Sequence, residues 1–355
     1  MDRNIPYDIA IIGGGISSCV FASSHISNGF TGKIAIIEAG RQLGGRASTR
    51  NSLINKGWQL NHGSPNLNIC NRKNNQLLKK FILELLKADI IISDKSDFIE
   101  LSENPISDSK IKNQFLEGYN FAPKSSMANL SKDIISLNNL NDQIDFYFGT
   151  LINNLAFKNN YWLLTAKNGD TYKSKFLVCS SNLLLHKRSI DIFKTNQIPL
   201  RKAITTNLER KIDSIISELK KQDYIQRLTF LIYTNSNYTF KDKYDEKCRY
   251  FFLNKSLQDK YKFERIIFQK QNNNRIGIVI HTKNIDLISE YNINKNENEF
   301  KENCILKFNT IFDRNSCINK LIDIKHFSIM KWRASQPNGK CISEDLQVCE
   351  KFNIG

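Results

Sequence analysis

The segment YDIAIIGGGISS, residues 7–18, joins an apolar run to three successive glycines. The unbroken apolar run at 9–12 predicts a strand of a parallel sheet whose two faces are both covered. The small and apolar residues after the glycines predict a helix, and Asn28 and Gly29 would end it as a C-cap. A second apolar strand, KIAIIE, follows and closes with Glu38. The opening therefore predicts a strand–helix–strand unit.

The glycines have the spacing of a dinucleotide-binding loop. Gly13 would let the chain turn sharply from strand to helix. Gly15 has no side chain, so a pyrophosphate could approach the amides that begin the helix, at Ile16 and Ser17. Ser18 takes the third position of the pattern, where a small residue allows the helix to pack closely on the sheet. These residues are the predicted contacts to the phosphates.

Glu38 lies 20 positions beyond Ser18, at the end of the second strand. A carboxylate at this place can accept hydrogen bonds from a ribose 2′-OH, and it disfavours the 2′-phosphate of NADP. On these residues the dinucleotide is either NAD or FAD. The alternative without a ligand is a glycine-rich turn of an unrelated α/β protein.

The next stretch, AGRQLGGRASTR at 39–50, separates FAD from NAD. Its Gly44, Gly45 and Arg46 resemble the second fingerprint of the flavin amine oxidase and renalase-like superfamily, in which G-G-R follows the ribose acid. The resemblance implies that Gly45 belongs to a loop passing close to the dinucleotide. It places Arg46 beside the pyrophosphate and the flavin, and it implies FAD as the cofactor.

Two further segments carry the same resemblance and supply the candidate catalytic residues. The runs at 48–50 and 61–64 resemble a renalase-type loop lying across the flavin, in which His62 would hydrogen-bond the flavin or a substrate, or would cap the loop. The run that begins with Trp332 and Arg333 resembles the W-R segment that precedes the family's C-terminal flavin-binding stretch. Trp332 would line the substrate side of the flavin or pack in the core.

The middle of the chain has a strand–turn rhythm. FYFGTLINNL (146–155) and YWLLTAK (161–167) read as strands, and Asn168 with the glycine after it signals a hairpin. With the apolar end of 171–179, this resembles the three-strand meander of FAD proteins followed by a strand that returns to the main sheet. The resemblance implies that Ile152 contacts the adenine through its backbone. An ordinary meander without a ligand is the alternative.

The rest of the chain predicts a second domain. TFLIYT, YFFLN, ERIIFQK and IGIVIHT read as antiparallel strands, and helical spacing appears at 77–88, 210–222 and 301–312. Tyr233 and His281 lie on these strands, and we interpret both as packing or facing solvent. The expected fold class is α/β: a Rossmann-like FAD-binding domain with a parallel sheet and a β-meander, plus an inserted α+β substrate domain with an antiparallel sheet. The predicted FAD-binding domain is 1–76, 126–185 and 326–355, and the predicted substrate domain is 77–125 and 186–325.

The family continues into a Gly-Asp motif and a final helix whose N-terminus faces the flavin. The chain reaches Gly355 where that segment would begin. The resemblance therefore leads us to expect that this chain lacks the C-terminal flavin-binding segment, which puts its FAD affinity and activity in question.

Composition narrows the class of protein. The 355 residues carry a formal net charge of +16, but the lysines are spread among many asparagines, which favours a solvated surface over a nucleic-acid site. The eight cysteines form no CxxC pair, and we find no signal peptide, membrane span or metal-ligand cluster. We expect a cytoplasmic protein with free thiols that binds a small-molecule substrate, neither nucleic acid nor membrane.

The predicted function is that of an FAD-dependent oxidoreductase. A hydride would pass from a small-molecule donor, an amine or a dihydronicotinamide-like compound, to the flavin, and dioxygen or another acceptor would reoxidise it. Three rivals stay open: a noncatalytic FAD-binding remnant, an NAD-linked dehydrogenase and a basic nucleic-acid-binding protein. The sequence does not determine the oligomeric state.

Overall fold

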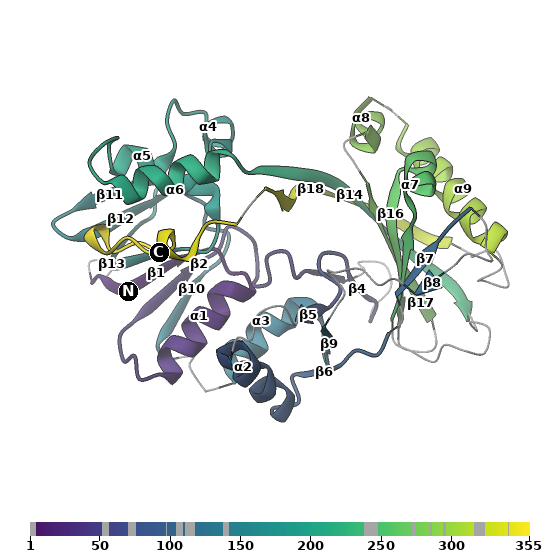
Figure 1. The fold of residues 1–355 in the computed structure, drawn as a ribbon, viewed down its shortest axis with the longest axis horizontal. Coiled ribbons are helices and arrows are strands. Elements are labelled where there is room, and N and C mark those ends of the chain that lie inside the picture. The colour runs from purple at the N-terminus through teal and green to yellow at the C-terminus, as the bar shows by residue number, and fades with distance from the viewer. Residues whose placement is uncertain are drawn as a thin grey trace. The chain divides into compact units, whose positions relative to one another are not determined.

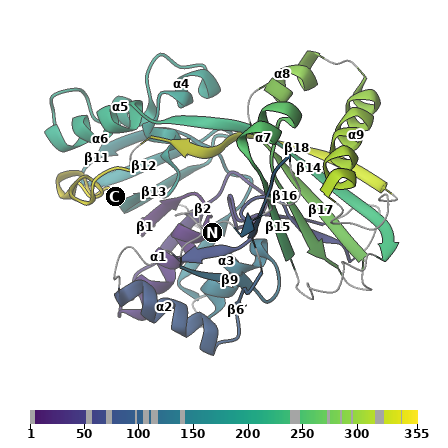
Figure 2. The same ribbon diagram turned by 45° about the vertical axis from the view of Figure 1, so that its right-hand side comes forward.

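The chain folds into two compact units, shown as a ribbon in Figures 1 and 2. The computed structural model describes residues 5–51, 57–69, 76–96, 98–103, 109–110, 118–137, 142–237, 248–271, 275–283, 286–293, 296–315, 324–339 and 341–355. Unit 1 consists of Met1–Ala47, Met127–Asp223 and Asn338–Gly355, and unit 2 consists of Ser48–Ser126 and Tyr224–Pro337. Both units are therefore discontinuous in sequence.

Unit 1 is built on a six-stranded sheet with the strand order β10-β2-β1-β13-β12-β11. The strands are β1 (Tyr7–Ile12), β2 (Ile34–Ile37), β10 (Ile144–Tyr147), β11 (Ile152–Lys158), β12 (Tyr161–Ala166) and β13 (Thr171–Cys179). β1 pairs in parallel with β2 and β13, and β10 pairs in parallel with β2. β11, β12 and β13 form an antiparallel meander. The predicted Rossmann-like sheet with a β-meander is confirmed.

β13 is a single strand where two strands were predicted. Its first half pairs with β12 (Ser174 opposite Trp162), and its second half pairs with β1 (Cys179 opposite Ile12). The expectation of a meander followed by a separate returning strand is therefore wrong, because one strand of nine residues spans both pairings. The apolar run at 146–155 in turn contains two strands, since Gly149 turns the chain at a φ of +65° between β10 and β11.

Helices cover the two faces of the unit 1 sheet. α1 (Ile16–Ser27) and α3 (Met127–Ser136) lie on one side, and α5 (Pro199–Ala203) and α6 (Arg210–Lys220) lie on the other (Figure 1). α1 ends where predicted, with Asn28 as its C-cap. The remaining helical segments are η3 (Asn182–Leu185), α4 (Arg188–Phe193), η5 (Glu344–Leu346) and η6 (Glu350–Phe352).

The C-terminal residues pack into unit 1. Ile354 forms a parallel bridge with Leu177 of β13, and the N–H of Gly355 donates to the carbonyl of Leu177 at 2.9 Å. The indole N–H of Trp162, a fully buried residue, donates to the carbonyl of Phe352 at 2.7 Å. This segment therefore completes the apolar core on the α5–α6 side of the sheet.

Unit 2 is built on a seven-stranded sheet with the strand order β18-β14-β17-β16-β15-β7-β8. The strands are β7 (Phe98–Leu101), β8 (Ser109–Lys110), β14 (Asp223–Asn237), β15 (Cys248–Leu253), β16 (Phe263–Lys270), β17 (Arg275–Thr282) and β18 (Ile324–Asn338). The four strands predicted from the apolar runs, β14 to β17, pair in antiparallel fashion as expected. β7 adds a parallel pairing with β15.

One face of this sheet is covered by α7 (Lys255–Tyr261), α8 (Asp286–Ile293) and α9 (Glu297–Asn315), as Figures 1 and 2 show. Alternate side chains of the strands pack against these helices, and Phe230, Phe263 and Phe308 are fully buried there. The helix predicted at 301–312 is confirmed as part of α9.

The other face of the unit 2 sheet carries the hairpin of β3 (Thr49–Asn51) and β4 (Gln59–Asn61). Leu60 of β4 is fully buried and packs among Trp58, Leu231 and Val279. Gly277 of β17 makes room for it, because a Cβ at Gly277 would lie 2.1 Å from Cδ2 of Leu60. The hairpin therefore packs closely against this face of the sheet.

A smaller sheet with the order β5-β9-β6 completes unit 2. Its strands are β5 (Leu67–Ile69), β6 (Ile91–Ser93) and β9 (Tyr119–Pro123), and α2 (Gln76–Lys87) precedes β6. The helix predicted at 77–88 is confirmed, but the apolar residues beyond it form a strand. Asp89 adopts a left-handed φ of +58°, which ends the helix and redirects the chain into β6.

The two units differ from the predicted division in three segments and at Ser126, which falls in unit 2. Residues 48–76 and 326–337 belong to unit 2, because the β3–β4 hairpin packs on its large sheet and β18 is a strand of that sheet. Residues 186–223 belong to unit 1, because α5 and α6 bury Leu200, Ile212 and other apolar side chains against the Rossmann-like sheet. None of the described helices is long and apolar enough to cross a membrane.

Candidate functional site

The glycine loop lies between β1 and α1 and leaves the start of the helix open. Gly13 has a φ of +101°, which L side chains avoid, and its N–H donates to the carbonyl of Ile37 at 2.8 Å. Gly15 is the N-cap residue of α1, and a Cβ built on it meets no atom within 4 Å. The N–H groups of the first helical turn, at Ile16 and Ser17, have no partner within the helix. This is the geometry that favours an anion.

Ser18 does more than provide the small side chain that its position requires. It is fully buried, and its hydroxyl donates to the carbonyl of Gly13. The serine therefore ties the first turn of α1 to the loop that precedes it. A glycine or alanine at this position would pack equally closely but could not make this bond.

The carboxylate of Glu38 lies beside the glycine loop at the end of β2. Its Oε2 accepts from the N–H of Gly14 at 2.6 Å, and its Oε1 accepts from the N–H of Gly40. The carbonyl of Glu38 accepts from the N–H of Thr150 at 3.0 Å, so the turn before β11 reaches the same place. Ile152 begins β11 with a buried side chain, and a contact to adenine would have to use its backbone, as predicted.

The second glycine loop touches the first. The N–H of Gly44 donates to the carbonyl of Gly14 at 2.8 Å, and a Cβ on Gly45 would lie 3.3 Å from the Cα of Gly15. Gly45 also has a left-handed φ of +56°. Arg46, the next residue, is exposed.

The structure thus gathers the predicted cofactor residues of unit 1 at the carboxyl ends of β1 and β2. These are Gly13, Gly15, Ile16, Ser17, Ser18, Glu38, Gly45, Arg46 and the backbone at Ile152. They fit a dinucleotide, because the start of helix α1, a space that a Cβ at Gly15 would fill and the carboxylate of Glu38 lie together. Their individual contacts to FAD stay predictions.

His62 and Trp332 form an aromatic pair in unit 2. Their ring centroids lie 5.3 Å apart with an interplanar angle of 39°, and His62 is only 5% exposed. Nε2 of His62 lies 3.3 Å from the hydroxyl of Ser48, while the buried Nδ1 has no hydrogen-bond partner among the described residues. Burial, and secondly the charge of Arg50, lower the pKa of His62 to about 4, so its imidazole is neutral near pH 7.

Arg333 does not join this pair. It follows Trp332 on β18, and successive side chains of a strand point to opposite faces. Arg333 is exposed, whereas Trp332 is partly buried. Of the three candidate catalytic residues, the structure therefore brings together His62 and Trp332.

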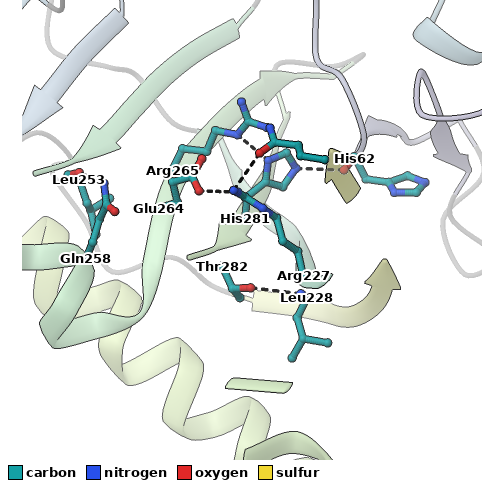
Figure 3. Close-up of polar contacts among 10 residues, drawn as sticks. His62, Arg227, Leu228, Leu253, Gln258, Glu264, Arg265, His281 and Thr282 are labelled. Atoms are coloured by element: carbon teal, nitrogen blue, oxygen red, sulfur yellow. Dashed lines mark hydrogen bonds and ion pairs between the residues drawn. The ribbon is translucent and has the colours of Figure 1, made fainter. Parts of the chain in front are cut away.

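Sequence reasoning missed the role of His281. Figure 3 shows it between Arg265 and the backbone of His62. Nε of Arg265 donates to Nδ1 of His281 at 2.6 Å, so Nε2 of His281 carries the proton and donates to the carbonyl of His62 at 3.0 Å. Burial and then the Arg265 charge lower the pKa of His281 well below its usual value. The available signal was an arginine within the apolar strand ERIIFQK, on the strand that pairs with β17.

Tyr233, the other residue interpreted as packing or facing solvent, packs. It is 1% exposed and lies edge-on to Trp58 with ring centroids 5.4 Å apart. The interpretation is confirmed for Tyr233.

Unit 1 also contains an apolar cavity of about 780 Å³. Phe21 of α1, Val178 of β13, Ile215 of α6 and Val348 are among its lining residues, and the ion pair of Asp8 and Lys175 lies at it. The glycine loop and Glu38 do not line this cavity, so it is separate from the predicted dinucleotide site. Within the described ranges, no group of three or more His, Cys, Asp or Glu residues could hold a metal ion.

Comparison with known proteins agrees with this fold. The family model for the NAD(P)-binding Rossmann-like domain matches residues 11–83. No curated protein sequence matches the chain. A putrescine oxidase variant with redesigned cofactor binding is 9% identical, with a TM-score of 0.60 over 92% of this chain and 84% of that chain.

Two further solved structures are similar. An oxidoreductase from Methanosarcina mazei is 8% identical, with a TM-score of 0.61 over 92% of this chain and 88% of that one. A candidate protoporphyrinogen oxidase from Exiguobacterium sp. is 9% identical, with a TM-score of 0.56 over 93% of this chain and 87% of that one. At these identities the likeness establishes a shared fold.

Proposed function

We propose that the chain is an FAD-dependent oxidoreductase that takes a hydride from a small-molecule donor. The observation that carries this proposal is the contact between the two glycine loops, in which Gly44 bonds to Gly14 and Gly45 approaches Gly15. A single glycine loop suits NAD or FAD equally, whereas the second loop resembles the flavin amine oxidase and renalase-like superfamily. The putrescine oxidase and the candidate protoporphyrinogen oxidase, whose fold the chain shares, support the same class.

The residues of unit 1 would hold the cofactor through its pyrophosphate and its ribose. The N–H groups of Ile16 and Ser17 would donate to the pyrophosphate at the positive end of α1. Glu38 would accept from the ribose hydroxyls, and Arg46 would place its exposed guanidinium beside the pyrophosphate. When bound, FAD supplies the hydride acceptor, and the protein supplies position and electrostatics.

In unit 2, His62 and Trp332 would contact the donor. The imidazole of His62 is neutral, so it can exchange a hydrogen bond with a donor without adding a charge. Trp332 would offer a flat apolar surface next to it. Arg333 stays a candidate by resemblance alone. A donor of the amine or dihydronicotinamide type, reoxidation by dioxygen or another acceptor, renalase-like specificity and a cytoplasmic location complete the proposal.

Cofactor uptake tests the proposal. The purified chain is incubated with FAD, desalted and examined for flavin absorbance, and it is expected to retain close to one FAD per chain. Gly15→Asp is expected to abolish retention, because it places a carboxylate in the open space at the start of α1. Aspartate is a preferred N-cap residue, so the fold should be unharmed.

Asn160→Asp is the matched control, since it makes the same charge change at an exposed turn of unit 1 and should leave retention unchanged. A folded wild-type chain that retains no FAD would overturn the proposal. If it instead binds NAD, the NAD-linked dehydrogenase is favoured. The match to the NAD(P)-binding family model is compatible with this rival. If it retains FAD but oxidises no donor, the noncatalytic remnant is favoured.

A further inference from the structure

Two arginines of unit 2 flank His281 on the sheet face that also carries the β3–β4 hairpin. β17 lies between β14 and β16, and His281 pairs with Thr229 on one side and with Arg265 on the other. Arg227 lies two residues before Thr229, so alternation places it on the same face of β14. Figure 3 shows Arg227 and Arg265 on either side of His281.

The cluster carries more positive than negative charge. Nη1 of Arg227 forms an ion pair with Oε2 of Glu264 at 2.5 Å, at an angle that does not make a hydrogen bond. Nη2 of Arg227 donates to Oε1 of Gln336 at 3.0 Å. The neutral His281 contributes no charge, so two guanidinium groups face the single carboxylate of Glu264.

The donors of these arginines are not all used. Arg227 is only 5% exposed, yet its Nε has no hydrogen-bond partner among the described residues. Arg265 uses Nε on His281, keeps partial exposure to solvent, and shows no acceptor for its terminal nitrogens within the described ranges. Burying a cation without a matching anion is costly, and planar guanidinium groups bind carboxylates and phosphates through paired hydrogen bonds.

We propose that Arg265 and Arg227 form a binding site for an anionic group, a carboxylate or a phosphate, of the hydride donor. The assignment of the ligand as the donor depends on the proposed flavin-dependent function. The anion would accept from the free terminal nitrogens of Arg265 and balance the second guanidinium charge. A protonated amine would be repelled by the same cluster. Of the two donor types considered, the one that carries anionic groups is therefore favoured over a simple cationic amine.

Three ligands that share one aromatic ring test this site by isothermal titration calorimetry on the full chain. Benzoate carries a carboxylate, phenyl phosphate carries a phosphate, and benzylamine carries a positive charge. We expect at least one of the two anions to bind at least tenfold more tightly than benzylamine, and the tighter of them identifies the group that the site prefers. If neither anion binds more tightly than benzylamine, the proposal is wrong.

Arg265→Gln is expected to weaken anion binding at least tenfold. Arg265→Lys keeps the positive charge but loses the planar guanidinium group, and it should weaken binding less. Arg275→Gln is the matched control, because Arg275 lies on the same sheet beside Trp58 and not in the cluster. Its anion affinity should equal that of the wild type. Unchanged affinity in Arg265→Gln would overturn the proposal, and circular dichroism establishes that each variant is folded.

The two proposals fail in different ways. A chain that retains FAD but does not distinguish anions from benzylamine would contradict the anion site alone. A chain that binds benzoate through Arg265 but retains no FAD would contradict the flavin-dependent function and leave the anion site in place.

Discussion

At the scale of single residues, His62 combines burial with an unmet hydrogen-bonding group. Its backbone carbonyl accepts from His281, its Nε2 lies near Ser48, and its Nδ1 has no partner among the described residues. Buried polar atoms in native proteins are nearly always paired. The unpaired ring nitrogen beside Trp332 therefore comes at a cost in stability.

The lowered pKa of His62 also makes the stability of the fold depend on pH. In the unfolded chain His62 is protonated below about pH 6.5, whereas in the fold it stays neutral down to about pH 4. The fold consequently loses stability as the pH falls through this window, by about 2–3 kcal/mol between pH 7 and pH 4.5. His62→Gln should show a loss smaller by that amount when urea unfolding is measured at both values. Equal losses in the two proteins would show that His62 titrates normally.

At the scale of elements, the β3–β4 hairpin is held on the sheet by side-chain amides. Gln269 of β16, only 3% exposed, accepts from the N–H of Asn61 at 2.9 Å and donates to its carbonyl at 2.8 Å. Gln271 accepts from the N–H of Gln59 at 2.9 Å. These amides satisfy backbone groups that a hairpin edge otherwise leaves unpaired. They also set the position of His62, one residue beyond β4.

Gln269→Met should therefore destabilise the fold by about 2–4 kcal/mol, because it removes the side-chain amide that bonds two backbone groups of Asn61 at a partly buried position. Hydrogen exchange of the hairpin amides should accelerate in the same variant. Gln258→Met is a suitable comparison, since the Gln258 amide donates to one carbonyl, that of Leu253, at a less buried position. Gln269→Met costing no more than Gln258→Met would refute the anchoring role of Gln269.

Local patterns predicted the opening of the chain because each feature there follows from neighbouring residues. Gly13 needs its positive φ, Gly15 must stay open, and Glu38 closes the next strand of the same unit. The cluster around His281 could not be predicted in this way. It joins His281 to Arg265 across a strand pairing and to a backbone carbonyl 219 residues away in the sequence, and neither contact leaves a local pattern.

The double role of β13 escaped prediction for a related reason. Its residues read as a strand whichever neighbours they have, and only the register with both β12 and β1 shows that one strand serves two parts of the sheet. The same limit applies to the predicted domain boundaries. Apolar periodicity located α6 but could not show which sheet its apolar face would cover.

At the scale of the whole molecule, a ligand that binds only the folded chain raises its stability by mass action. FAD at 100 times its dissociation constant should raise the free energy of unfolding by about 2.7 kcal/mol and shift the melting temperature upward in a concentration-dependent way. NAD at the same concentration should give a much smaller shift, because it lacks the flavin half that the second glycine loop is proposed to meet. A larger shift with NAD than with FAD would favour the dehydrogenase.

The pairing of β1 with β13 bears on how the protein is made. At ribosomal rates of about 5–20 residues per second, β13 emerges about 10–30 s after β1. Throughout that delay the apolar strand YDIAII has one hydrogen-bonding edge without its native neighbour. Such an edge can pair with other nascent chains until the meander has been translated.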